Sequence, residues 1–312
     1  MSVRELIGRI AGYRASLWEE TPSEADLQRE LAETSAAAEF GKGGFAPLPE
    51  SILRLSNVLA DPYFRTKDAV GALDSDPALA VDVLRLANSA AFIGRSPCRS
   101  TADAFNRLGA TRVKDLVVSS YLEGLGASMS GYSRIAFDHS IRVAKIARAL
   151  PANAGCTPDR LYLCGLVHDI GITLLDQSGE FTYYTGHYED DDVQCAAERS
   201  VLGFDHATLG AVAAELWGLP HPISAVIVGH HHPDEALAQP GDAGRMSALL
   251  FIAEDLERLT GGTDQLSEAD FERVAASSAG QLMEISAAVL QSLWSERVVG
   301  KLHTKQSARS AA

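Results

Sequence analysis

The chain has 312 residues, a formal net charge of −14 and a composition that is 46% hydrophobic and 22% charged. This length suits one large or two small domains, and the composition is that of an ordinary globular protein. No apolar run reaches the roughly 20 residues of a membrane-spanning helix, and the acidic balance without a Lys/Arg cluster argues against nucleic acid as a partner. Glu5, Arg9 and Arg14 interrupt the apolar N-terminus, so we expect no signal peptide and predict a cytoplasmic protein without a membrane partner.

Residues 1–44 are predicted to form a helical N-terminal extension. Apolar side chains including Leu6, Ile7 and Ile10 recur at helical spacing and continue to Leu17 and Trp18. The glycine-rich stretch FGKGGFAPLP, residues 40–49, then breaks the pattern. Because an exposed apolar helix face would be a liability, we expect the extension to dock on the rest of the chain.

Residues 45–130 are predicted to form a first lobe of short packed helices. Asp76 precedes Pro77 at one helix start, and Ser100 with Asp103 can open the next helix. A further helix follows Gly109, and the glycine- and serine-bearing stretch GLGASMSGYS then predicts a boundary near residue 130.

Residues 131–265 are predicted to form a second helical lobe, followed by C-terminal helices and a tail over residues 266–312. Thr157 and Asp205 are predicted to cap two helices of this lobe, and an apolar helix is expected to run through ISAVIVGHHH to Pro233. The apolar stripe of another helix includes Ile135 and Val143. Since no alternating strand pattern competes, the predicted fold is all-α and two-lobed.

The four cysteines of the chain form no C-x-x-C pair. They are Cys98, Cys156, Cys164 and Cys195. We therefore expect small, reduced core residues rather than a disulfide framework or a zinc ribbon.

The stretch CGLVHDIG places His168 and Asp169 at the end of an apolar run that is otherwise typical of a buried helix. The pair alone is weak evidence for a metal site, because a histidine near a helix C-terminus is favoured by the helix dipole. Other imidazoles and carboxylates lie on strongly apolar helices in the same way: His139, His206, His230, His231 and Asp255. An unpaired buried polar group costs kilocalories, so convergence of these groups on one site would remove a large penalty.

Five imidazoles and two carboxylates suit transition-metal ions such as iron, manganese, nickel or zinc. Seven ligands are too many for one ion, whereas two ions that share a bridging carboxylate would use them, and Asp169 is the natural bridge. Successive helical residues point about 100° apart, so His230, His231 and His232 cannot all reach one ion. We expect His232 to be exposed, and compensation of a helix dipole is the alternative role for its neighbours.

In this order these residues resemble the HD superfamily of metal-dependent phosphohydrolases, with the ligand set of its HD-GYP branch. The wider chain resembles the HDOD family, the HD-related output domains of bacterial signalling proteins, over about residues 45–260. The matching stretches are PLPESILRLSNVL, DPALAVDVLRLANSAAF, FNRLGATRVKDLVV, DHSIRVAKIARAL, LCGLVHDIGITLL, ERSVLGFDHATLGAVAAELWGLP and IVGHHHP.

The resemblance implies an all-α fold whose second lobe carries the HD-type helices. It implies that His139, His168, Asp169 and Asp255 are the core metal ligands and that His206, His230 and His231 complete a second ion. One or two divalent ions, iron or manganese before others, would be the cofactors. Two features depart from the HD-GYP pattern: Ile172 stands where HDIGK has lysine, and the string GYP does not occur.

Two functions follow from this resemblance. HDOD proteins act in signalling, which favours a regulatory protein that works through protein–protein interaction with signalling partners, and the missing lysine points the same way. The alternative is a two-metal phosphohydrolase acting on a nucleotide or another phosphoester, with Asp169 as the bridging carboxylate, and the complete set of seven ligands supports it. We prefer the regulatory interpretation, since fold analogy does not establish a reaction.

Overall fold

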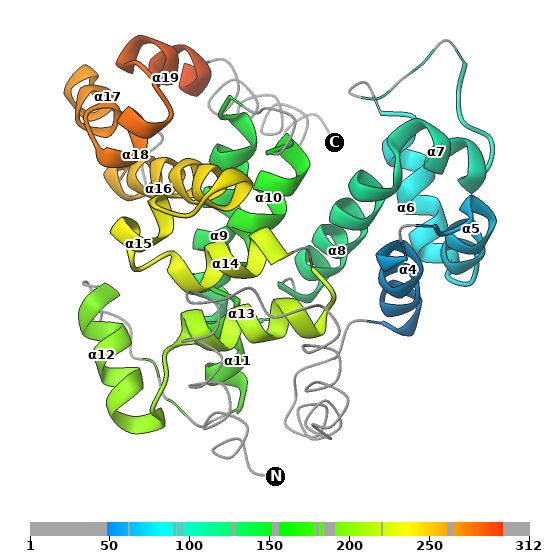
Figure 1. Cartoon of the computed structure of the whole chain (residues 1–312), viewed down its shortest axis with the longest axis horizontal. Coiled ribbons are helices and arrows are strands. Elements are labelled where there is room, and N and C mark those ends of the chain that lie inside the picture. Colours follow the sequence, from blue (N-terminus) through cyan, green and yellow to red (C-terminus); the bar gives the residue numbers. More distant parts are fainter. Residues whose placement is uncertain are drawn as a thin grey trace.

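The computed structural model describes residues 49–61, 63–89, 92, 94, 96–126, 129–151, 156–178, 181, 183, 191–219, 221–260 and 265–295. All regular elements of these residues are helices, which confirms the all-α prediction (Figure 1). The predicted N-terminal extension lies outside the described residues. None of the described helices is long and apolar enough to span a bilayer.

The first lobe packs four short helices beside one longer helix. They are α4 (Glu50–Ala60), α5 (Thr66–Asp74), α6 (Pro77–Ala87), α7 (Thr101–Leu108) and the longer α8 (Ala110–Gly126). The predicted helix starts are confirmed: Asp76 accepts from the backbone of Ala78 and Leu79, and Ser100 forms a capping box with Asp103. Their local hydrogen bonds satisfy backbone donors that the first helical turn leaves free.

Helix α8 joins the two lobes, because it packs both on the first lobe and on α10 (Pro158–Val167) of the second (Figure 1). Two ion pairs cross this junction. Arg112 Nε lies 2.7 Å from Asp159 Oδ2, and Arg160 Nε lies 3.6 Å from Asp115 Oδ2. Asp115 is fully buried, and neither of its oxygens accepts a hydrogen bond from a described residue.

The burial of Asp115 predicts a pH-dependent loss of stability. Burial raises the pKa of its carboxyl from 3.8 to about 6, against the opposing charge of Arg160. A carboxyl whose folded pKa exceeds its unfolded pKa opposes folding when charged, so the stability present at low pH is lost as the pH rises from about 4 through 6. A shift of this size corresponds to about 3 kcal/mol. Denaturant unfolding should therefore show Asp115→Asn gaining up to that amount on the wild type between pH 4 and 7, and a constant difference would contradict this account.

The second lobe contains the remaining helices and most of the hydrophobic core. They are α9 (Gly131–Ala149), α10, α11 (Ile170–Ser178), α12 (Asp191–Leu202), α13 (His206–Leu216), α14 (His221–Gly229), α15 (Pro233–Leu237), α16 (Gly241–Thr260), α17 (Glu268–Ala275), α18 (Ser278–Leu282) and α19 (Ala287–Leu293). Helix α9 packs against α10, α11 and α16, while α13 packs between α11 and α14. The predicted caps Thr157 and Asp205 are confirmed by their bonds to the backbone N–H groups of Arg160 and Thr208.

The two glycines of CGLVHDIG allow unusually close helix packing. A Cβ atom at Gly165 would lie 2.7 Å from the Ala144 Cα of α9, and one at Gly171 would lie 1.9 Å from the His206 carbonyl oxygen. Only glycine lets these backbones approach so closely without a shift. His168 and Asp169 thereby lie directly between α9 and the start of α13.

Two local predictions need correction. Ile135 is 52% exposed, because α9 turns Ala136 and Phe137 into the core instead. Helix α14 ends at Gly229, so His230 and His231 lie in a turn rather than in the predicted helix.

Candidate metal centre

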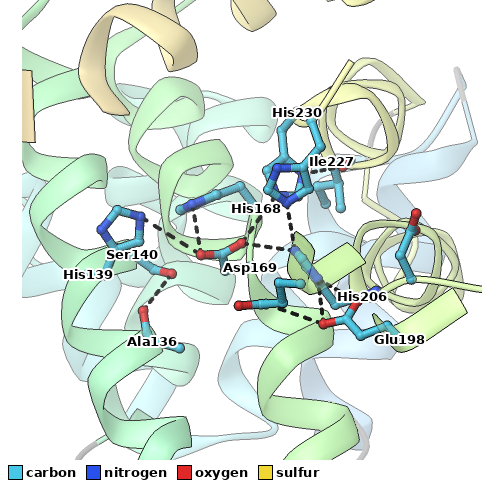
Figure 2. A network of polar contacts seen from close by, with 12 residues as sticks. Ala136, His139, Ser140, His168, Asp169, Glu198, His206, Ile227 and His230 are labelled. Atoms are coloured by element: carbon cyan, nitrogen blue, oxygen red, sulfur yellow. Dashed lines mark hydrogen bonds and ion pairs between the residues drawn. The ribbon is translucent and has the colours of Figure 1, made fainter. Parts of the chain in front are cut away.

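Two helices and two turns supply six of the seven predicted ligands, and these six lie close together. His168 and Asp169 occupy the turn between α10 and α11, while His139 lies in the middle of α9. His206 is the first residue of α13, and His230 and His231 follow α14. Figure 2 shows Asp169 among the imidazoles of His139, His168, His206 and His230. We call these residues the Asp169 centre: His139, His168, Asp169, His206, His230 and His231.

The two oxygens of Asp169 face different histidines. Its Oδ2 lies 3.2 Å from His168 Nε2 and 3.8 Å from His139 Nε2. Its Oδ1 lies 3.2 Å from His230 Nε2 and 3.5 Å from His206 Nε2. The Nε2 atoms of His206 and His231 are 2.8 Å apart. The centre therefore has a first half (His139, His168) and a second half (His206, His230, His231), which share one carboxylate.

The opposite ring nitrogen, Nδ1, is held in four of these histidines by a group that accepts hydrogen bonds. His168 Nδ1 lies 2.8 Å from the Gly165 carbonyl oxygen, and His230 Nδ1 lies 2.6 Å from that of Ile227. A carbonyl oxygen can only accept, so these Nδ1 atoms carry the proton.

Carboxylates take the same place beside the other two rings. His206 Nδ1 lies 2.8 Å from Glu198 Oε2, and His139 Nδ1 lies 3.0 Å from Glu257 Oε2. In each ring this leaves Nε2, directed at Asp169, as the ligand atom.

This geometry fits divalent metal ions. If the rings are neutral, their Nε2 lone pairs face a carboxylate and repel it, so protons or cations are needed between them. Donor atoms bonded to one ion at about 2.0–2.2 Å lie about 3 Å or slightly more from each other. The separations from 2.8 Å, between His206 and His231, to 3.8 Å, between His139 and Asp169, are of that size.

The carboxylate and the imidazoles shift one another's pKa values. Burial would lower the pKa of His168, but the charge of Asp169 outweighs it and raises that pKa to about 9. Against the same burial, Glu198 and Asp169 hold the pKa of His206 well above its usual value. Burial opposes ionisation of Asp169, yet His168 and the neighbouring rings keep its pKa well below 3.8. Burial together with His230 and His206 lowers the pKa of His231, which leaves that ring neutral.

The prediction that Asp255 joins this set is not supported by its position. Its carboxyl is half-buried beside Arg258 and Arg273, and burial raises its pKa. The preceding residue, Glu254, faces the centre instead, with Oε1 3.3 Å from His168 Nε2. Adjacent residues on α16 point about 100° apart, so only one of the two carboxylates can face the centre.

Glu254 is a candidate ligand that the sequence reasoning missed. It is buried, its Oε1 atom has no hydrogen-bond partner among the described residues, and burial raises its pKa. Glu257, three residues later, bonds to His139 and also lies 2.5 Å from Arg142 Nε. The spacing of Glu254 and Glu257 along one face with Leu250 was the signal available in the sequence.

The remaining predicted residues lie elsewhere. His232 is half-buried rather than exposed and is not part of the centre. All four cysteines are buried and carry reduced thiols, as expected. One of them, Cys195, lies with Glu198 against His206.

The centre reaches solvent in both of its halves. His139 is 30% exposed, Asp169 is 12% exposed and His231 is half-buried, whereas the side chains of His168, His206 and His230 are each 1% exposed. Beside the first half, Arg142 of α9 is 51% exposed next to Glu257.

Two solved structures are similar to this chain in fold. A Geobacter sulfurreducens HDOD domain protein of unknown function superposes with a TM-score of 0.59 at 22% identity, covering 85% of this chain and 94% of that one. A candidate phosphohydrolase from Shewanella amazonensis SB2B superposes with a TM-score of 0.53 at 24% identity, covering 86% of this chain and 95% of that one. At these identities the likeness shows the fold alone.

Two comparisons rest on sequence. An uncharacterised protein of Treponema pallidum (strain Nichols) is 24% identical over 228 residues, which are 68% of this chain but only 42% of that relative. This chain thus spans less than half of that relative's length. The sequence profile of the HDOD domain matches residues 45–233, more than half of the chain, and the chain therefore belongs to the HDOD domain family.

Proposed function

We propose that this protein is a metal-dependent HDOD signalling protein whose Asp169 centre binds two divalent ions and hydrolyses a phosphoester. The single observation that carries the proposal is the position of Asp169, which directs one oxygen to each half of the centre. A shared carboxylate between two sets of imidazoles is the arrangement that a two-ion site needs. The proposal thus favours the hydrolase that we treated as the alternative, within a signalling family.

The residues of the chain have distinct roles in this proposal. Asp169 would bridge the ions, His139 and His168 would bind one, and His206, His230 and His231 would bind the other. Glu254 offers the first ion an oxygen that has no other described partner. When bound, two such ions polarise a phosphoryl oxygen and lower the pKa of water. The proposed donors are imidazole nitrogens and carboxylate oxygens and include no thiolate, a combination that suits iron or manganese.

One observation favours a purely regulatory role as the second candidate. Ile172, at the position of the HD-GYP lysine, is 5% exposed and packs in the core, so no cation reaches the centre from that position. A cavity of about 550 Å³ lies instead on the first lobe, between α4 and α5, and is lined by residues including Arg54, Asn57 and Phe64. In this case the ions would stabilise the second lobe, and signalling partners would bind elsewhere.

Metal analysis of protein purified without oxygen or chelators tests the proposal. We expect about two equivalents of iron or manganese by mass spectrometry and their loss in His168→Ala. Bis(p-nitrophenyl) phosphate should then be hydrolysed by the metal-loaded wild type and not by His168→Ala or Asp169→Ala. Two bound ions without turnover of this or other phosphoesters would support the regulatory candidate. Protein that stays metal-free after anaerobic reconstitution would exclude the metal centre.

Metal binding should become tighter as the pH rises. The pKa of His168 is raised to about 9, so at neutral pH this ring carries a proton that an ion must displace. Release of this proton makes the apparent affinity for the ion at His168 rise about tenfold per pH unit at pH values below about 9, with a plateau above. Titrations with Mn²⁺ at fixed ionic strength would measure this slope, and an affinity independent of pH would contradict the assignment of His168 as a ligand.

A further inference from the structure

The outer hydrogen bonds of the Asp169 centre follow the same plan in both halves. Each half has one ring whose Nδ1 is held by a backbone carbonyl, His168 in the first half and His230 in the second. Each half also has one ring held by a carboxylate: Glu257 holds His139, and Glu198 holds His206. The two glutamates therefore occupy equivalent places, although they lie on different helices, α16 and α12.

Glu198 is committed to His206 by several hydrogen bonds. It is fully buried, and its Oε2 accepts from the His206 backbone N–H at 2.7 Å and from the ring Nδ1 at 2.8 Å. Its Oε1 accepts from the Tyr183 hydroxyl at 2.7 Å and from Gln194 Nε2 at 3.3 Å. Tyr183 in turn stacks on Tyr132 of α9. The carboxylate is thus fixed on one side by Tyr183 and Gln194. On its other side it holds the ring of His206, as Figure 2 shows.

Helix α12 attaches to the lobe through this polar contact. Among its described side chains, the buried ones are Gln194, Cys195 and Glu198; Cys195 and Glu198 lie against His206, and Gln194 donates to Glu198. Its apolar residues contribute less: Val193 and Val201 are 55% and 54% exposed, and Ala197 and Leu202 are only partly buried against the core. A surface helix normally buries its apolar face, so the hydrogen bonds of Glu198 are a main part of the docking of α12. The helix lies at the edge of the second lobe in Figure 1.

We propose that Glu198 is the positioning residue of the second half, so that binding of the second ion is coupled to the docking of α12 on the lobe. This inference rests on the proposed two-ion centre. The carboxylate keeps the proton of His206 on Nδ1 and turns Nε2 toward Asp169 and His231. When α12 is displaced, His206 loses that constraint, and the second half loses an oriented ligand. An ion bound there stabilises the docked helix in return, because linkage between two equilibria is reciprocal.

Binding of Mn²⁺ to the full chain tests this with Glu198→Gln. The amide keeps the shape and can still accept from His206, but it lacks the charge and one acceptor. Loss of such an outer partner typically weakens metal binding by 10–100-fold. At Mn²⁺ concentrations that saturate the wild type with two ions, we expect one ion in Glu198→Gln. Electron paramagnetic resonance should change from the signal of a coupled pair to that of an isolated Mn²⁺ ion.

Two further variants make the result specific. Glu257→Gln should also lose one ion, the ion of the first half. Glu272 is exposed and lies outside the centre, so Glu272→Gln removes the same charge but should keep both ions. Two ions bound to Glu198→Gln with wild-type affinity would overturn the role of Glu198 and leave the proposed function intact. A wild type that binds no Mn²⁺ would overturn both.

Hydrogen exchange tests the coupling without altering Glu198. Mn²⁺ should slow amide exchange in residues 191–202 of the wild type. It should not do so in His206→Ala, a substitution that leaves the sequence of α12 unchanged. Equal slowing in the two proteins would overturn the coupling, even if Glu198→Gln failed to fold.

Discussion

Asp169→Asn is expected to abolish binding of both metal ions, the largest functional effect of any single substitution in this chain. The amide is neutral and cannot offer an anionic oxygen to each half, where the wild-type carboxylate has Oδ2 3.2 Å from His168 and Oδ1 3.2 Å from His230. The loss should exceed the roughly 100-fold that removal of an outer partner causes. Metal content by mass spectrometry and Mn²⁺ titration would measure it.

The neighbouring carboxylates of α16 provide the matched controls. Asp255→Asn should keep both ions, because its side chain lies by Arg258 and Arg273 rather than at the centre. Glu254→Gln should weaken the first half, since its Oε1 lies 3.3 Å from His168 Nε2. The reverse pattern, with loss in Asp255→Asn and none in Glu254→Gln, would restore Asp255 as a ligand. Two ions retained in Asp169→Asn would refute the shared carboxylate.

Gly171→Ala is expected to cause the largest loss of stability from a single methyl group. The new Cβ would lie 1.9 Å from the carbonyl oxygen of His206, and backbone cannot move aside as a flexible side chain can. Overpacking of this kind costs about 3 kcal/mol at the upper end of its usual range. Because the strain falls on His206, we also expect weaker binding of the second ion. Denaturant unfolding and Mn²⁺ titration would measure the two effects.

Gly124→Ala is the control for helix propensity. Gly124 lies within α8, and a Cβ there would meet nothing within 4 Å. Alanine should therefore stabilise the protein by about 0.5–1 kcal/mol, the usual difference from glycine within a helix. If Gly171→Ala were as stable as the wild type, the close approach of α11 to α13 would not exist in solution.

The sequence by itself determined the elements whose causes are local. Asp76, Thr157 and Asp205 cap helices through hydrogen bonds to N–H groups two or three residues later, so the predicted starts agree with the structure. The HDIG motif and the histidines on apolar helices also predicted the Asp169 centre, because buried polar groups need partners. The order of these residues along the chain was enough to indicate the family.

Only the tertiary structure decided which polar residues face the centre. Asp255 and Glu254 are adjacent in sequence, and the rotation of α16 against α9 and α10 selects Glu254. Glu198 contacts His206, which is 8 residues away in the sequence. Glu257 contacts His139, which is 118 residues away. No periodicity within a helix predicts which acceptor will meet a given Nδ1, since that contact depends on how two helices pack. The sequence thus predicted that histidines and carboxylates form the centre, whereas packing between helices determined which of these side chains face it.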